Sequence, residues 1–447
     1  MKAALTERVM WTMYLARHWR GQSRFPYRPA AAIERAQSSR VREMVSHARL
    51  TVPYYRETMT RLGLLPHEFR SASDLSRLPV IEQEQLQRDP EYFQSDSHRI
   101  GEDLESRSGG SRGAPRGVKW DTAAIFQNAA HAERERSIVA KAVGRFVNYR
   151  ETVIGSPYGS EREIQELYAN RAILPSRSRV QYQHLSLLDS PERNVALLNE
   201  FRPDVIRSYG SYLDRLFTHV HATGAVLHRP KVVFYDADEL PERARRLISD
   251  DFGVCILSAY QAVEAFKIGF ECELHNGIHL NTDLYPVRLV DEDLGDVAAG
   301  DSGEVVVSNL VNRATVLLNY RLGDVARMLT AGCTCGRTLP LMSFIEGRTD
   351  DWVTLSSGEA IHPQSIRTLF TDEKQISQYQ VIQRRRDHFT VALAGITENA
   401  MLAERIVGRF RDRFGQSVSV DVTFVKSIEP SVGGKIRPVI SLVRSGA

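Results

Sequence analysis

Three cysteines and one histidine are spaced so that they could bind a metal ion. Six residues separate Cys272 from His279, and one residue separates Cys333 from Cys335. Three thiols and an imidazole form a Cys₃His set, which suits tetrahedral Zn²⁺. The spacing differs from the usual C-x2-C, and His275 competes for the same position. With 13 histidines in the chain, a metal site and a chance neighbour both stay open on spacing alone.

A loop of small residues between arginines could bind phosphate. The segment 106–115 reads SRSGGSRGAP, and backbone N–H groups and hydroxyls of such a loop can surround phosphate oxygens. The Gly-Lys-Ser/Thr end of a Walker loop is missing, and an ordinary solvent-exposed loop is the alternative. The candidate phosphate contacts are Ser108, Gly109, Gly110, Ser111, Arg112 and Gly113.

Two short motifs each combine an aromatic ring with a carboxylate. Tyr260 and Glu264 follow an apolar run, and Tyr320 and Asp324 flank the tripeptide Arg-Leu-Gly. A ring can stack on a nucleotide base, a carboxylate can bind Mg²⁺, and a fixed Asp can accept two hydrogen bonds from a ribose diol. The plainer alternatives are a Tyr that covers the core beside a solvated Glu, and a Gly-Asp turn.

A lysine near the end of the chain follows a glycine pair. Lys435 is one of only eight lysines among 58 basic residues, and Gly433 and Gly434 precede it. A flexible loop of this kind could bring a cation to an anionic site, whereas a solvated hairpin lysine is the alternative.

These residues need elements that position them, and the middle of the chain predicts a parallel sheet. Short apolar strands alternate there with amphipathic helices, which is typical of a doubly wound α/β sheet with a ligand crevice beyond the carboxyl ends of its strands. Those ends carry Asp236, Asp238, Tyr260 and Glu264. The predicted strands are Asp204–Ser208, Lys231–Tyr235 and Val254–Ser258, and the predicted helices are Ser211–Thr223 and Pro241–Asp250.

The flanking regions have other patterns. The first hundred residues favour helices, and 283–325 favours strands joined by glycine turns. Residues 346–351 are polar and read as a linker. A helix near Asn399–Phe414 and a strand at Val420–Val425 predict a small α/β domain at the end of the chain.

Composition narrows the class of protein. The chain has 447 residues, 42% of them hydrophobic, and 58 basic against 55 acidic residues give a net charge of +3. This balance of charges argues against a nucleic-acid-binding surface. The sequence contains no 18-residue apolar run, so we expect no membrane-spanning helix. Four cysteines do not make a disulfide scaffold, so we expect a cytoplasmic protein.

Taken in order, these segments resemble the phenylacetate–CoA ligase family of the adenylate-forming enzymes, in a divergent CapK-like branch. The segment 108–115 is similar to the family's phosphate loop S-S-G-T-T-G-K-P. Tyr260–Glu264 resembles the motif that stacks adenine and holds Mg²⁺, and Tyr320–Asp324 resembles the ribose motif Y-R-T-G-D. Gly347–Asp351 is similar to the family's G-R-x-D-D hinge, and Lys435 falls where the family has its adenylation lysine.

The resemblance implies a fold and a division into domains. We expect the adenylate-forming ligase fold of the α/β class: a large N-terminal adenylation domain over 1–348, with doubly wound sheets and a β-rich subdomain. A small mobile α/β lid domain over 349–447 would carry Lys435 and turn about Asp350 and Asp351. The segments around Cys272 and Cys333 resemble the family's E-C-x4-G-x-H and C-x-C-G-R stretches, which favours a structural Zn²⁺ site.

The resemblance also implies an activity. We expect an ATP-dependent ligase that forms acyl-AMP from Mg·ATP and a carboxylic acid and then passes the acyl group to a second nucleophile. CoA is the family default, and an amine, a sugar or a carrier protein are alternatives. A nucleotidyltransferase that leaves AMP on a hydroxyl, and a nucleotide-binding protein without turnover, stay open as rivals. A homodimer is also left open.

Individual roles follow from the matching positions. Lys435 and Glu264 would be catalytic, Glu264 as the Mg²⁺ ligand, and Asp324 with Arg348 would bind ribose. Asp236, Ala237, Asp238, Tyr260 and Gln261 would surround adenine. Four positions depart from the family pattern, namely Ala114 for the phosphate-loop Lys, Gln261 for Gly, Val263 for a hydroxyl residue and Thr282 for Glu. Phenylacetate as the acid therefore does not follow.

Overall fold

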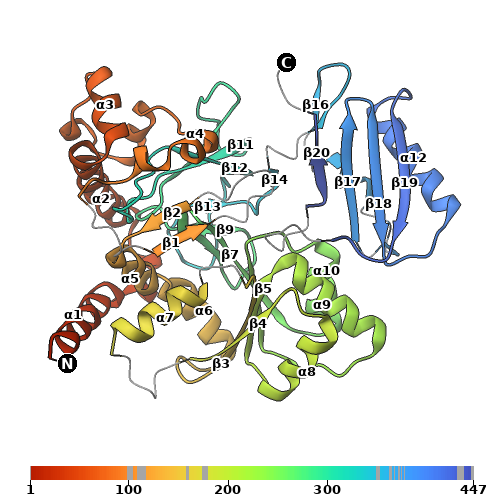
Figure 1. Cartoon of the computed structure of the whole chain (residues 1–447), viewed down its shortest axis with the longest axis horizontal. Coiled ribbons are helices and arrows are strands. Elements are labelled where there is room, and N and C mark those ends of the chain that lie inside the picture. The colour runs from red at the N-terminus through yellow and green to blue at the C-terminus, as the bar shows by residue number, and fades with distance from the viewer. Residues whose placement is uncertain are drawn as a thin grey trace. The chain divides into compact units, whose positions relative to one another are not determined.

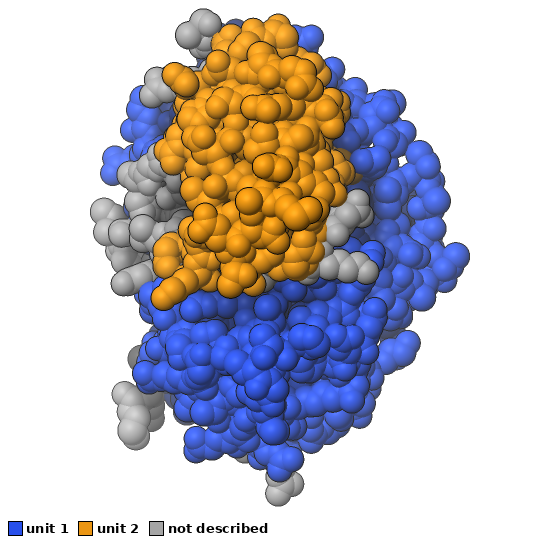
Figure 2. Space-filling model, turned by 90° about the vertical axis from the view of Figure 1, so that its right-hand side faces the viewer, with its two compact units in different colours: residues 1–322, 327–344 blue, residues 323–326, 345–447 orange. Residues whose placement is uncertain are grey.

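The computed structural model forms two compact units (Figure 2), which are described separately. The first comprises residues 1–322 and 327–344, and the second residues 323–326 and 345–447. The structure describes residues 2–97, 104–107, 117–157, 161–173, 180–348, 353–361, 365–366, 368–370, 373, 375–376, 378–429 and 437–443.

An eight-stranded sheet forms the centre of the first unit, with the strand order β13-β9-β8-β7-β6-β5-β3-β4. Its parallel part consists of β3 (Arg150–Gly155), β4 (Gln181–Ser186), β5 (Val205–Tyr209), β6 (Val232–Asp236) and β7 (Cys255–Ala262). The strands β8 (Ala265–Glu271), β9 (Ile278–Leu280) and β13 (Leu341–Met342) continue it in antiparallel fashion. The predicted parallel sheet is thereby confirmed, with strand bounds within a few residues of those expected.

Helices cover both faces of this sheet because side chains alternate between the faces along each strand. One face packs with α8 (Pro191–Phe201), α9 (Gly210–Thr223) and α10 (Glu242–Arg246) into a core that includes Ile206, Val233 and Ile256 (Figure 1). The other face packs with α6 (Glu133–Val143) around Val205, Phe234 and Leu257. The expected helix over Pro241–Asp250 is α10, continued by a turn of π-helix over Leu247–Asp251.

The first hundred residues are helical, as the sequence predicts. The helices are α1 (Lys2–Trp19), α2 (Ala30–Thr51), α3 (Pro53–Arg61) and α4 (Gln83–Arg88), with 3₁₀ turns at Gln22–Tyr27, Pro66–Glu68, Ala72–Arg77 and Pro90–Phe93. In α2 the apolar positions Ile33, Val41, Met44, Val45 and Ala48 are buried. The helix ends at Thr51 because Val52, which precedes Pro53, takes an extended conformation. Of the described helices, none is long and apolar enough to cross a membrane.

Further elements of the first unit extend the sheet and its helical cover. Strands β1 (Leu104–Arg107) and β2 (Gly117–Trp120) pair in antiparallel fashion and flank the glycine- and serine-rich segment. Helices α5 (Thr122–His131) and α7 (Glu161–Arg171) follow along the chain. Strands β10 (Val287–Val290) and β11 (Ser302–Val307) form the glycine-turn hairpin that the sequence predicts.

The second unit is a small α/β domain. Its sheet has the order β19-β18-β17-β20, formed by β17 (Gln378–Arg385), β18 (His388–Ala394), β19 (Ser419–Val425) and β20 (Val439–Ser441). Helix α12 (Ala400–Phe414) packs Leu402, Ile406 and Phe410 into the same core as Val381 and Val391. The pair β15 (Val353–Thr354) with β16 (Ala360–Ile361) and a 3₁₀ turn at Thr368–Phe370 complete it. Helix and strand lie within a residue of their predicted bounds.

Candidate functional site

The turn between β7 and β8 presents a buried carboxylate. Glu264 lies in this turn with 6% of its surface exposed. The hydroxyl of Tyr320 donates a hydrogen bond to its Oε1 over 3.1 Å, and Asn309 Nδ2 donates to its backbone carbonyl over 2.8 Å. The two aromatic–carboxylate motifs, 56 residues apart at these positions, therefore meet in the first unit.

An aromatic pair also contacts this turn. The indole of Trp120 stacks on Phe266 with ring centroids 3.9 Å apart, and its Nε1 donates to the carbonyl of Val263 over 3.0 Å. Tyr260, 7% exposed, lies opposite Gly269 in β8. A side chain at Gly269 would come within 2.8 Å of the carbonyl of His279 in β9, so glycine permits the close approach of these strands.

The segment after β6 is shaped by hydrogen bonds to neighbouring elements. Gln261 Nε2 donates to Asp236 Oδ2 over 2.8 Å, and Ala237 has a left-handed φ of 67°. Asp238 accepts hydrogen bonds from the backbone N–H of Ser211, over 3.1 Å, and from its hydroxyl. Asp238 thus caps the first turn of α9, where a negative charge is favourable. Sequence reasoning missed this capping role.

A network of charged side chains reaches this segment at Asp236, and sequence reasoning also missed it. Arg207 Nε donates to Glu151 Oε1 over 2.9 Å, and its Nη1 lies 3.7 Å from Asp236 Oδ2. Lys267 Nζ donates to Glu135 Oε1 over 2.7 Å. Burial alone would lower the pKa of Arg207, but the carboxylates of the network raise it above its usual range. An arginine within an apolar strand was the only signal in the sequence.

Asp324, the carboxylate of the second aromatic–carboxylate motif, pairs with an arginine within the second unit. Strand β12 (Tyr320–Arg327) pairs with β14 (Gly347–Arg348), and this register sets Asp324 opposite Arg348. Arg348 Nη1 lies 3.1 Å from Asp324 Oδ1, and their side chains are 32% and 14% exposed. The two side chains to which the sequence assigns ribose binding are therefore neighbours.

The predicted metal ligands lie together. The donor atoms of Cys272, His279, Cys333 and Cys335 all lie within 4.8 Å of one another. Cys272 Sγ and Cys333 Sγ are 3.7 Å apart, and Cys335 Sγ and His279 Nε2 are 3.4 Å apart. A tetrahedral Zn²⁺ with Zn–S of about 2.3 Å and Zn–N of about 2.0 Å requires edges of roughly 3.8 and 3.5 Å. The donor types therefore suit zinc, and the Cys272–Cys333 and Cys335–His279 distances are close to two edges of a tetrahedral site.

The surroundings of this cluster explain its electrostatics. Burial raises the pKa of Cys272 to about 12 and lowers the pKa of His279 to about 4. For Cys335 the effect of burial is outweighed by hydrogen bonds from Arg337, which lower the pKa of this thiol. A neutral imidazole and a thiolate are the forms that bind a metal. The competitor His275 lies instead against Glu271, with Nδ1 and Oε1 2.8 Å apart.

Known proteins resemble this chain in sequence. The phenylacetate–coenzyme A ligase of Thermus thermophilus is 24% identical over 93% of this chain and 97% of its own. The chain is thus similar in sequence to a phenylacetate–coenzyme A ligase over most of its length. The same enzyme of Escherichia coli is 24% identical over 80% of each chain, and residues 353–442 match the family model of the CapK C-terminal domain.

The chain has the fold of solved adenylate-forming ligases. A 2-hydroxyisobutyryl-CoA ligase, solved with R3-HIB-AMP, matches with a TM-score of 0.73 at 19% identity, over 92% of this chain and 90% of its own. The amide bond synthetase McbA of Marinactinospora thermotolerans matches with a TM-score of 0.52 at 16% identity, over 75% and 67% of the two chains. The predicted fold class is confirmed.

Several of the site residues that the sequence predicts lie outside the described residues. These are the phosphate-loop candidates Ser108, Gly109, Gly110, Ser111, Arg112 and Gly113, the hinge residues Asp350 and Asp351, and Lys435. Their roles stay predictions.

Proposed function

We propose that the protein is an ATP-dependent ligase that activates a carboxylic acid as acyl-AMP and then transfers the acyl group to CoA. The observation that carries this proposal is the hydrogen bond from Tyr320 to the buried carboxylate of Glu264, which joins two motifs of the family. The relatives named phenylacetate–coenzyme A ligase and the fold support it.

In the first half-reaction the acid's carboxylate attacks the α-phosphorus of ATP, an acyl–phosphate bond forms, and the bond to pyrophosphate breaks. Catalysis of such a step consists mainly of positioning and charge stabilisation. Mg²⁺, when bound, neutralises phosphate charge, and Glu264 is the proposed ligand. Tyr260, Gln261 and the 236–238 segment would bind adenine.

Most of the remaining proposed roles involve the second unit, and one involves the 108–113 loop of the first unit. Asp324 and Arg348 would hold the ribose hydroxyls, and Lys435 would neutralise the phosphate and carboxylate oxygens. We further propose that residues 349–447 act as a lid that turns about Asp350 and Asp351, and that the 108–113 loop binds the leaving phosphates.

We also propose that Cys272, His279, Cys333 and Cys335 hold one structural Zn²⁺. The closed Cys₃His set leaves no open coordination position, as in structural rather than catalytic sites. The ion would connect Cys272, which follows β8, and His279, which lies in β9, to the segment 333–337. The donor distances of 3.7 and 3.4 Å support this connection.

Carboxylate-dependent exchange of pyrophosphate into ATP tests the proposal. A panel of aryl, alkyl and amino acids should include at least one that supports exchange and, with CoA added, yields a thioester. Glu264→Gln should lose exchange, and the matched control Glu242→Gln, at a side chain 66% exposed, should keep it. Formation of an amide with an amine acceptor would show that the second step uses an amine instead of CoA. ATP binding without exchange for any acid would contradict the ligase, and AMP left on a hydroxyl acceptor would favour the nucleotidyltransferase.

A further inference from the structure

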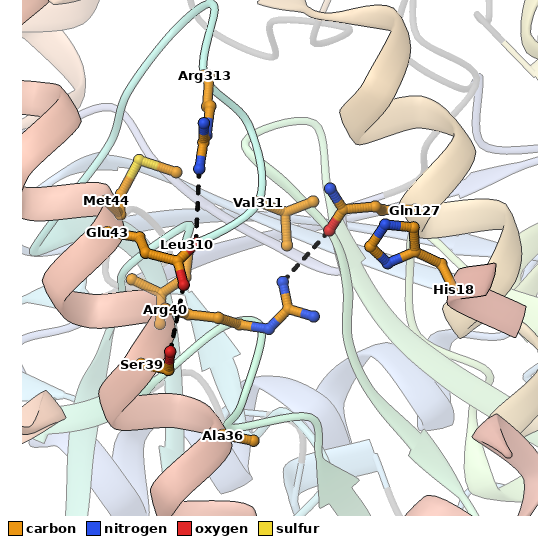
Figure 3. A pocket seen from close by; sticks show the side chains of 10 residues that line it. All are labelled: His18, Ala36, Ser39, Arg40, Glu43, Met44, Gln127, Leu310, Val311 and Arg313. Atoms are coloured by element: carbon orange, nitrogen blue, oxygen red, sulfur yellow. Dashed lines mark hydrogen bonds and ion pairs between the residues drawn. The ribbon is translucent and has the colours of Figure 1, made fainter. Parts of the chain in front are cut away.

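A hollow between the N-terminal helices of the first unit has no part in the proposed reaction. Side chains from α1, α2, α5 and the segment 310–313 line it, and its volume is about 320 Å³ (Figure 3). Volumes of this size are at the lower end of the range for small-molecule sites.

The charges in this hollow are unbalanced. Arg313 Nη2 lies 3.7 Å from Glu43 Oε2, so the one carboxylate among the lining residues already has a basic partner. Arg40 extends from α2 toward Gln127, and its Nη1 donates to Gln127 Oε1 over 3.2 Å (Figure 3). Among the residues that the structure describes, no carboxylate lies within ion-pair distance of Arg40. Within the described part of the chain, this guanidinium with five N–H donors thus makes one hydrogen bond, to a neutral amide.

Two histidines beside the hollow are held in the neutral form. Burial, Arg40 and Arg17 lower the pKa of His18, which lines the hollow. The ring of His131 lies edge-on to that of His18 with centroids 6.4 Å apart, is 1% exposed, and has no hydrogen-bond partner for either nitrogen among the described residues. Burial, Arg134 and Arg40 hold its pKa well below the usual range. Burial is the main cause of both shifts, and the positive charge of Arg40 contributes to each.

We propose that this hollow binds a small organic anion through Arg40, with a carboxylate or phosphate group against the guanidinium. Planar carboxylate and phosphate oxygens match the paired donors of a guanidinium. Gln127 would orient Arg40, and His18 would lie beside the bound anion. The test of this site does not depend on the proposed ligase reaction, because binding is measured without turnover.

Titration calorimetry of the full-length protein at constant ionic strength tests this inference. The probes are succinate, inorganic phosphate and, as a neutral analogue, succinamide. We expect saturable binding of one or both anions, none of succinamide, and at least tenfold weaker binding by Arg40→Gln. The matched control is Arg42→Gln, at an exposed position of the same helix, which should bind as the wild type does. Preference between succinate and phosphate identifies the anionic group.

A second measurement keeps a structural effect of the variant apart from loss of binding. Arg40→Lys retains the charge but not the planar fork and should bind with intermediate affinity. In the wild type the anion should shift the NMR signal of the His18 ring, assigned with His18→Gln, and raise the pKa of His18. Non-saturable heats, equal binding by Arg40→Gln, or an unmoved His18 signal at saturation would overturn the proposal.

Discussion

The Cys/His cluster and the nucleotide motifs differ in how the two units supply them. All four cluster residues belong to the first unit, and their donor atoms already lie within 4.8 Å of one another. The proposed nucleotide-binding residues are divided, with Tyr260 and Glu264 in the first unit and Asp324 and Arg348 in the second. A structural ion requires a complete set of ligands at all times. A ligase with two half-reactions gains from groups that can be engaged in one step and withdrawn in the other.

The largest expected effect concerns Lys435. Its proposed role depends on the conformation of the lid, because this lysine belongs to residues 349–447. Lys435→Ala should lower carboxylate-dependent ATP–pyrophosphate exchange on the order of 10²–10³-fold, because a preorganised cation is lost from the transition state. Acyl transfer from synthetic acyl-AMP should stay nearly unchanged. Lys426→Ala, at an exposed lysine of the same unit, serves as control. Equal loss in both half-reactions would remove the distinction between them.

Removal of a cluster ligand should have a structural and not a catalytic signature. Cys272→Ala should reduce bound zinc from about one ion per chain to a small fraction, and thermal unfolding should move down by several degrees, because zinc binding contributes to folding. Cys255→Ala removes the one cysteine outside the cluster and should change neither quantity. Zinc content by elemental analysis of protein purified without chelator is the measurement. A wild type free of zinc whose thiols titrate readily would contradict the site.

The cluster could be predicted from sequence because two signals coincide. Three thiols and a histidine suit a metal ion, although their spacing alone also allowed a chance neighbour, and the resemblance of both segments to the family's cysteine stretches favoured the metal site. The parallel strands could also be predicted from sequence, because alternating apolar strands and amphipathic helices are local patterns. By contrast, the pairing of Arg207 with Glu151 depends on the register of β3 beside β5, which no local pattern specifies.

Close approaches between distant segments could not be predicted either, because no local sequence pattern specifies them. A side chain at Gly210 would meet the backbone of Glu239 and Leu240 at 2.4 Å, so the start of α9 and the 238–240 segment touch directly. This contact turns Asp238 toward Ser211 and gives it a capping role, where motif matching suggests a nucleotide contact. Sequence similarity identified the position but not its neighbours.

The hydrogen bond between Tyr320 and Glu264 should contribute to the stability of the first unit, which holds this part of the nucleotide motifs. Tyr320→Phe leaves a buried carboxylate short of one donor and should lower the free energy of unfolding by about 1.5–3 kcal/mol. Urea unfolding is the measurement. Tyr92→Phe deletes the same kind of bond, 2.6 Å to Glu57, at an exposed site and should cost less. If both variants lose equally little, Glu264 does not depend on Tyr320. Zinc content should be unchanged in both variants.

The smallest effect, and the sharpest separation of roles, concerns Asp324 in the second unit. Asp324→Ala should raise the KM for ATP about tenfold, or roughly 1.4 kcal/mol, if its carboxylate binds the ribose hydroxyls. Asp324 also lies 3.1 Å from Arg348 Nη1, so the same loss could arise from a displaced arginine. A double-mutant cycle with Arg348→Ala distinguishes the two causes. If Asp324 binds ribose itself, its removal raises the KM further in the Arg348→Ala background. If it only holds Arg348 in place, the double variant is no worse than Arg348→Ala alone, and ribose binding then falls to the arginine.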